Sequence, residues 1–187
     1  GIFIDSKVGL ALSHRRLSII DTSTSGHQPM VSSCGRFVVC YNGEIYNTEQ
    51  LRHQLSSKNY HFRGHSDTEV LVEGLTEYGV VNLAKKLNGI FSFAAFDRKD
   101  RRLWLVRDHI GVKPLYYGFS RNDFIFGSEL KALTAPGLWP LRINRNVISS
   151  FLRHSYVPAP FSIYEGISKL PKSLKVLLEN LLRYEDD

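Results

Sequence analysis

The sequence predicts an α+β protein made of antiparallel sheets with helices outside them, and three observations carry this prediction. Short segments of alternating apolar and polar residues dominate the chain and follow one another in pairs joined by turns. Only two clear helices are indicated between these strands, so repeated βαβ units are not expected. Several strands are apolar on both faces and need cover on both sides, which favours two stacked sheets with helices outside.

Spacing and turn residues predict most elements in order. In chain order these are a strand over residues 35–41, an Asn42-Gly43 loop, a helix capped by Asn47 or Thr48 that ends near residues 58–59, a helix capped by Ser66 or Asp67 that ends before Gly79, a hairpin over residues 90–106 and a second hairpin over residues 116–126. Residues 156–160, with two prolines, predict an extended connector. The leucines of residues 174–182 have helical spacing, so a marginal helix is expected there unless it docks.

Composition narrows the class of protein. The 187 residues are 43% hydrophobic and 22% charged, as in an ordinary globular domain. The net charge is +6, but the densest basic cluster, residues 98–102, is interleaved with acidic residues, so nucleic-acid binding is not expected. No apolar stretch could span a bilayer and no signal peptide is visible, so a cytoplasmic location is expected, without membrane contact. The oligomeric state cannot be read from the sequence.

Five residues have a purely structural interpretation, and two of them also have a chemical one. Asn42 and Gly43 supply a side-chain amide and a backbone N–H that suit a developing oxyanion, yet Asn-Gly is also the strongest short hairpin signal. Taken alone, Arg16 suits a surface ion-pair partner and Asp67 suits a helix N-cap. Glu44 suits a solvated side chain.

The cysteines and histidines predict no site. Cys34 and Cys40 form no C-x-x-C pair, so we expect both to be reduced, small core residues rather than nucleophiles or metal ligands. His61 and His65 are four residues apart but fall where a strand or loop is expected, so no metal site is predicted.

Several motifs, in this order, strongly resemble the glutaminase domain of glutamine-dependent asparagine synthetases. They are His14-Arg15-Arg16-Leu17-Ser18-Ile19-Ile20-Asp21, Gly26-His27-Gln28-Pro29-Met30, Tyr41-Asn42-Gly43-Glu44-Ile45-Tyr46-Asn47, Ser66-Asp67-Thr68-Glu69-Val70, Leu87-Asn88-Gly89, residues 107–117 and residues 128–133. The resemblance extends to about Pro171. It implies an N-terminal-nucleophile hydrolase fold, a four-layer αββα sandwich, incomplete at its N-terminus. Residues 1–145 would form the class II glutamine amidotransferase domain, and residues 146–187 a connector toward a synthetase domain.

The resemblance also implies roles for particular residues. Glutamine would be the substrate, hydrolysed to glutamate and ammonia, with Asn42 and Gly43 as the oxyanion donors. Arg16 aligns with the arginine that binds the glutamine α-carboxylate, and Glu44 and Asp67 with the carboxylates that receive its α-ammonium group. The segment Leu17, Ser18, Ile19 and Ile20 resembles the one that lines the glutamine pocket.

The chain also departs from the family pattern. The family's N-terminal cysteine nucleophile and its Arg-Gly-Pro-Asp segment are missing, so the chain alone is expected to be inactive. No nucleotide-binding loop is visible, so ATP and Mg²⁺ are expected only in the absent synthetase domain, which would amidate aspartate. Two alternatives stay open: an inactive glutamine-binding module, or an amidotransferase for another acceptor such as a surface-polysaccharide sugar.

Overall fold

The computed structural model describes residues 1–15, 26–135, 137, 139, 141–171 and 177–179. Its elements in chain order are β1 (Ile2–Asp5), β2 (Leu10–Ser13), β3 (Met30–Val31), β4 (Phe37–Ile45), α1 (Thr48–Ser56), α2 (Asp67–Lys86), β5 (Gly89–Asp97), β6 (Arg102–Arg107), β7 (Tyr116–Ser120), β8 (Asp123–Gly127), α3 (Leu130–Thr134), the 3₁₀ turn η2 (Arg145–Val147), α4 (Ile148–His154), β9 (Ile167–Lys169) and β10 (Leu177–Glu179). Strand pairs among them are antiparallel, so the predicted α+β class is confirmed.

The chain divides into two compact units, which are described separately. The first comprises Gly1–Val106 and Val176–Asp187, and the second comprises Arg107–Lys175. The predicted boundary between a glutaminase domain and a connector, at residue 145, stays a prediction.

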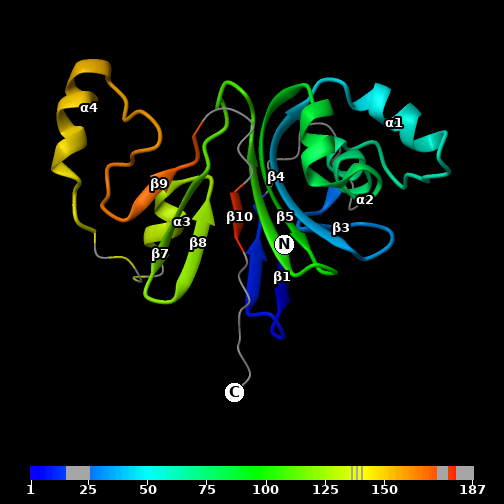
Figure 1. Cartoon of the computed structure of the whole chain (residues 1–187), viewed down its shortest axis with the longest axis horizontal. Coiled ribbons are helices and arrows are strands. Elements are labelled where there is room, and N and C mark those ends of the chain that lie inside the picture. Colours follow the sequence, from blue (N-terminus) through cyan, green and yellow to red (C-terminus); the bar gives the residue numbers. More distant parts are fainter. Residues whose placement is uncertain (16–25, 136, 138, 140, 172–176, 180–187) are drawn as a thin grey trace. The chain divides into compact units, whose positions relative to one another are not determined.

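The first unit is organised around a five-stranded sheet. Its strand order is β10-β6-β5-β4-β3, and α1 and α2 lie beside β3 and β4 (Figure 1). Residues 91–97 of β5 are all buried, although successive side chains of a strand point to opposite faces. Both faces of this strand are therefore covered, as its apolar sequence predicts. Leu71 and Leu75 of α2 are fully buried and belong to the same core.

Strand β4 is longer than predicted, and this corrects the Asn42-Gly43 loop. Both residues lie within the strand, where Asn42 pairs with Ser92 and Gly43 with Phe91 of β5. Gly43 has φ 153°, and a Cβ built on it would lie 2.2 Å from the carbonyl oxygen of Ile90. The glycine therefore serves a close approach of two strands and not a hairpin turn.

Both predicted helices are present, with differences at their ends. Ser66 is the N-cap of α2, and its Oγ accepts a hydrogen bond from the Glu69 N–H at 3.3 Å. Asn47 stands at the N-cap of α1 without a side-chain capping bond; its amide instead donates to Lys86 O and accepts from Asn88 N. Helix α2 also continues past a kink at Gly79 to Lys86, because residues 80, 83 and 84 are still buried.

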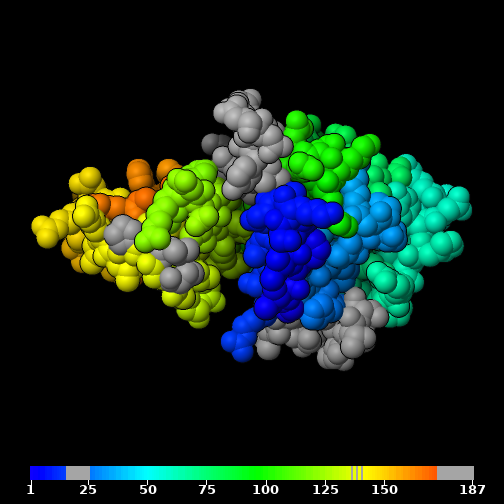
Figure 2. Space-filling model, turned by 90° about the horizontal axis from the view of Figure 1, so that it is seen from below, coloured from blue at the N-terminus to red at the C-terminus, as the bar shows by residue number. Residues whose placement is uncertain are grey.

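The hairpin of β1 and β2 was not predicted from the sequence. It pairs Ile2 with Ser13 and forms a separate two-stranded sheet in the first unit. Leu10 and Leu12 are buried, whereas Ile2 and Ile4 on the partner strand are exposed. Figure 2 shows this hairpin, in dark blue, at the surface next to the following segment of the same unit. Exposed apolar residues on a short strand weaken the amphipathic signal that would have revealed it.

The second unit contains the three-stranded sheet β8-β7-β9. Trp139 packs with Leu133 and Ile167 in its small core, and Gly118 leaves room for the Trp139 ring. The predicted hairpin of β7 and β8 is present. The predicted extended connector at residues 156–160 is wrong, because this segment turns. Phe161 N donates to Pro158 O, and Lys169 N donates to Pro160 O. These bonds fold the proline segment back onto β9.

The predicted helix over residues 174–182 is corrected at Leu177–Glu179, and its other residues lie outside the described part of the chain. Leu177–Glu179 forms β10, which pairs with Leu103, Trp104 and Leu105 of β6. Pairing of β10 with β6 satisfies backbone groups on both strands, whereas a short isolated helix has little intrinsic stability. Among the described residues, no helix is both long and apolar enough to cross a membrane.

Two substitutions in α2 test the assignment of its buried face. Leu71 is 0% exposed, so Leu71→Ala should lower the free energy of unfolding by about 2–5 kcal/mol through lost burial and a cavity. Val81 on the same helix is 42% exposed, so Val81→Ala should change it by no more than about 0.5 kcal/mol. Urea unfolding of both variants measures this, and equal effects would contradict the assignment.

Candidate functional site

The candidate site lies toward the C-terminal end of β4. Asn42 and Gly43 are each partly exposed there, and Glu44 is exposed. Buried Tyr41 and Ile45 flank this triplet on either side. The register with β5 fixes the backbone of all three residues, because each is paired across the sheet. A side-chain amide, a backbone N–H and a carboxylate are thus presented from one rigid strand.

Asp67 is brought to the same place from the start of α2. Its Oδ2 accepts a hydrogen bond from the Tyr41 hydroxyl at 2.6 Å and lies 3.4 Å from the Ile45 N–H donor. These two partners flank Asn42, Gly43 and Glu44 in β4. Both contacts use Oδ2. The predicted N-cap alternative is wrong for Asp67, because Ser66 holds that position.

Burial determines the protonation of the Tyr41 hydroxyl. Burial raises the pKa of Tyr41 above its ordinary value, and the nearby Asp67 carboxylate raises it further. The phenol therefore stays protonated and donates to the aspartate at neutral pH. Glu44 and Asp67 give the site two carboxylates, a combination that suits a cationic group.

A buried glutamine joins β4 to α2 beside this site. Gln28 Oε1 accepts from Tyr41 N at 2.6 Å, and its Nε2 donates to Thr68 Oγ1 at 3.3 Å. Gln28 and Thr68 belong to the sequence motifs, but the sequence predicts no role for either of them. Their position in the family-like motifs was the only sequence signal for such a role, since Thr68 directly follows the candidate site residue Asp67. Arg16, Leu17, Ser18, Ile19 and Ile20 lie outside the described residues.

Cys40 does not have the properties of a nucleophile. Burial raises the pKa of its thiol to about 12, so it is neutral near pH 7. Its sulfur contacts the carbonyl oxygen of Ser13 at 3.9 Å. The prediction that Cys40 is a small core residue therefore agrees with its surroundings, although it is only partly buried.

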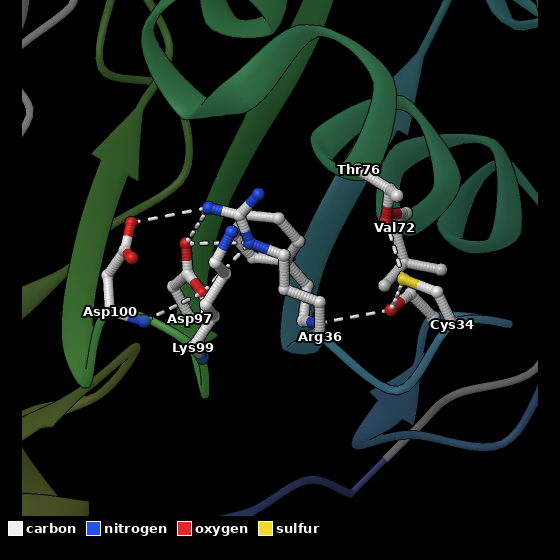
Figure 3. A network of polar contacts seen from close by, with 9 residues as sticks. Cys34, Arg36, Val72, Thr76, Asp97, Lys99 and Asp100 are labelled. Carbon is white, nitrogen blue, oxygen red and sulfur yellow. Dashed lines mark hydrogen bonds and ion pairs between the residues drawn. The ribbon is translucent and has the colours of Figure 1, made fainter.

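Cys34 is exposed, which corrects its prediction as a core residue. Figure 3 shows its sulfur near Thr76 of α2, at 3.7 Å from the Oγ1, while the neighbouring Arg36 pairs with Asp97. Burial by itself would raise the pKa of Cys34, but hydrogen bonds from Ser32, the Arg36 backbone and Thr76 lower it overall. Among the described cysteines, neither forms a disulfide.

The motif at residues 107–117 has a structural role in the second unit. The Arg107 guanidinium donates to the carbonyl oxygens of Gly111, Lys113 and Leu170 at 2.5, 2.6 and 2.5 Å. The Asp108 carboxylate accepts from the backbone amides of residues 110–113. Burial would raise the pKa of Asp108, but these amides lower it overall. Arg107 and Asp108 therefore fix the loop between β6 and β7.

No metal centre accompanies the site in the part of the chain that the structure describes. No group of three or more His, Cys, Asp or Glu side chains could hold an ion there. His61 and His65 are both exposed.

Comparison with known proteins identifies the family. Residues 1–181 match the family model described as a glutamine amidotransferase domain. The chain belongs to this family and is a glutamine amidotransferase domain of asparagine synthetase-like proteins. The predicted resemblance is confirmed.

Two relatives and one solved structure illustrate the similarity. The chain is 38% identical to asparagine synthetase [glutamine-hydrolyzing] 3 of Bacillus subtilis, over 84% of this chain and 26% of that protein. It is 34% identical to putative asparagine synthetase [glutamine-hydrolyzing] 2 of Methanocaldococcus jannaschii, over 91% of this chain and 36% of that protein. Glutamine phosphoribosylpyrophosphate amidotransferase from B. subtilis has a similar structure, with TM-score 0.56 and 25% identity over 66% of this chain and 28% of its own. The chain thus spans about a quarter to a third of the length of these proteins.

A pair of glycine substitutions tests the close approach at Gly43. In Gly43→Ala the new Cβ would meet the Ile90 carbonyl oxygen, and the backbone would be strained at φ 153°. Gly9 also has a positive φ, of 64°, but a Cβ there meets nothing within 4 Å. We expect Gly43→Ala to lower the free energy of unfolding by about 1–3 kcal/mol more than Gly9→Ala, measured in urea. Equal losses would mean that the strands do not approach as described.

The two thiols should differ in reactivity. At pH 8 iodoacetamide should alkylate Cys34 readily, and Cys40 at least about 100-fold more slowly, because the raised pKa of Cys40 leaves little thiolate. In a Cys34→Ser variant, the rate at Cys40 should rise about tenfold per pH unit as the pH approaches 12. Mass spectrometry of the alkylated peptides measures both rates. Equal labelling of the native protein at pH 8 would refute this assignment.

Proposed function

We propose that this chain is the glutamine-recognition part of a glutamine-hydrolysing asparagine synthetase-like enzyme. Arg16 binds the α-carboxylate of L-glutamine, Glu44 and Asp67 bind its α-ammonium group, and residues 17–20 line the pocket. The Asn42 side-chain amide and the Gly43 N–H donate to the oxygen of the side-chain amide as negative charge develops there. Substrate choice then depends on recognition of both ends of a free amino acid.

One observation supports this proposal above the others. Asp67 is held by Tyr41 and Ile45 at the two ends of the Asn42-Gly43-Glu44 triplet. Asp67 therefore contacts β4 just before and just after the segment that carries the two candidate oxyanion donors and Glu44. A ligand with an ammonium group at one end and an amide at the other suits this arrangement, and the family match names glutamine as the amide donor.

The acceptor chemistry belongs to another part of the protein. The relatives are named as asparagine synthetases, and the chain covers only 26% and 36% of the two described above. We propose that ammonia passes to an ATP-dependent synthetase domain, normally on the same polypeptide, that activates aspartate. ATP and Mg²⁺ act in that domain, and none of the residues assigned here binds them.

Hydrolysis in this family, as the resemblance implies, uses an N-terminal cysteine whose own α-amino group is the base. Cys34 and Cys40 are internal and carry no free α-amino group. A protein made of residues 1–187 alone should therefore bind glutamine without hydrolysing it.

Calorimetry with residues 1–187 tests the proposal directly. Wild-type protein should bind L-glutamine, and Arg16→Lys should weaken binding about tenfold or more, because an ammonium cannot reproduce the two parallel bonds of a guanidinium to a carboxylate. Arg15→Lys, a change at the exposed neighbouring arginine, is the matched control and should leave the affinity within twofold. Absence of binding by the wild type, or equal losses in both variants, would refute the proposal.

A further inference from the structure

The loop that leads into Asp67 is held from two sides. On one side, Arg52 of α1 donates from Nη1 to Gly64 O at 3.0 Å and from Nη2 to Ser66 O at 3.3 Å. On the other side, Glu69 of α2 accepts from Arg63 N at 2.8 Å and from Gly64 N at 2.9 Å. One residue therefore binds carbonyl oxygens of the loop and the other binds its amides.

The hydrogen bonds of Glu69 and Arg52 to the loop are charge-assisted, because a carboxylate accepts the first pair and a guanidinium donates the second. Glu69 is only 4% exposed, and each of its carboxylate oxygens meets a backbone amide. The Arg52 guanidinium also lies over the Phe62 ring, with its central carbon 4.4 Å from the ring centroid. Charge-assisted hydrogen bonds from partly desolvated groups hold geometry more firmly than neutral surface bonds do. The loop is thus fixed in register with both helices.

Glu69 does more than cap a helix. In an ordinary capping box, the glutamate at the third helical position reaches back to the N–H of the N-cap residue. Here Ser66 is the N-cap, but the Glu69 carboxylate instead binds the amides of Gly64 and Arg63, which lie two and three residues before Ser66. Its charge is used to hold the loop.

Asp67 stands between these contacts and the site. The residue before it is bound by Arg52, and the second residue after it is Glu69. Its own carboxylate meets Tyr41 and Ile45 of β4. A shift of the loop would move the start of α2 and with it the Asp67 carboxylate.

We propose that Arg52 and Glu69 are positioning residues that set the place of the Asp67 carboxylate and thereby the selectivity for ligands with a free α-ammonium group. This inference rests on the proposed function. A positioning role differs from a purely structural role in one measurable respect. Loss of either contact should weaken recognition of the ammonium group more than recognition of the rest of the ligand.

The test compares L-glutamine with 4-carbamoylbutanoate, which is glutamine without its amino group. Calorimetry with residues 1–187 gives both affinities, and the affinity ratio is the affinity for L-glutamine divided by that for 4-carbamoylbutanoate. Glu69→Gln places an amide donor against a backbone N–H, and Arg52→Lys cannot reach both carbonyl oxygens. Each variant should weaken glutamine binding about tenfold and 4-carbamoylbutanoate binding less than twofold.

Glu73→Gln is the matched control. Glu73 is also a buried glutamate of α2 and also accepts from a loop, through Ser33 N at 2.7 Å and Ser33 Oγ at 2.9 Å. That loop is at residues 32–36, so the variant should lower thermal stability as Glu69→Gln does but keep the affinity ratio. If Glu69→Gln does not fold, Arg52→Lys carries the test, because Arg52 is only partly buried.

The outcomes separate the two proposals. A fall in the ratio in Glu69→Gln or Arg52→Lys, with the ratio kept in Glu73→Gln, supports the positioning role. An unchanged ratio in both variants, or an equal fall in Glu73→Gln, overturns it while leaving the proposed function in place. Failure of the wild type to bind glutamine overturns both.

Discussion

The hydrogen bond between the Tyr41 hydroxyl and the Asp67 carboxylate is the contact on which the candidate site depends. It joins the start of α2 to β4 through two residues that are 26 positions apart in the chain. A bond to a charged group contributes about 1.5–3 kcal/mol and costs more when one partner is left buried and unpaired. Gln28 reinforces the junction from the interior by bonding to both Tyr41 N and Thr68. The described groups of the site, Asn42, Gly43, Glu44 and Asp67, are carried by a strand and a helix rather than by a loop.

Helix α2 supports two loops through buried carboxylates. Glu69 holds the loop before the helix, and Glu73, one turn further on, holds Ser33 in the loop between β3 and β4. Residues four apart lie on one face of a helix, so both carboxylates point to the same side. A buried carboxylate is costly unless it accepts hydrogen bonds, and here backbone amides and the Ser33 hydroxyl supply them, with the Arg63 guanidinium 3.8 Å from Glu69 as well. The helix therefore orders the segments around the site as well as the core beneath them.

The second unit uses a similar device at Arg107 and Asp108. The guanidinium binds carbonyl oxygens, the carboxylate binds amides, and together they hold the loop of residues 108–113. Arg52 and Glu69 divide the same task between two helices in the first unit. Glu69, Arg107 and Asp108 lie in motifs shared with the family, and each of them binds backbone groups of the same chain. A conspicuous charged motif is therefore not by itself evidence of a ligand.

The sequence by itself determined the elements whose signals are local. The apolar alternation of β5, the hairpin of β7 and β8, and the Ser66 cap of α2 follow from side-chain period and capping chemistry within a few residues. The order of its motifs also determined the family. Only the tertiary structure decided that Asn42 and Gly43 lie inside a strand and that Leu177–Glu179 is a strand and not a helix. The physical reason is that a strand is defined by a partner distant in sequence, and the same holds for Asp67, whose site exists only where α2 meets β4.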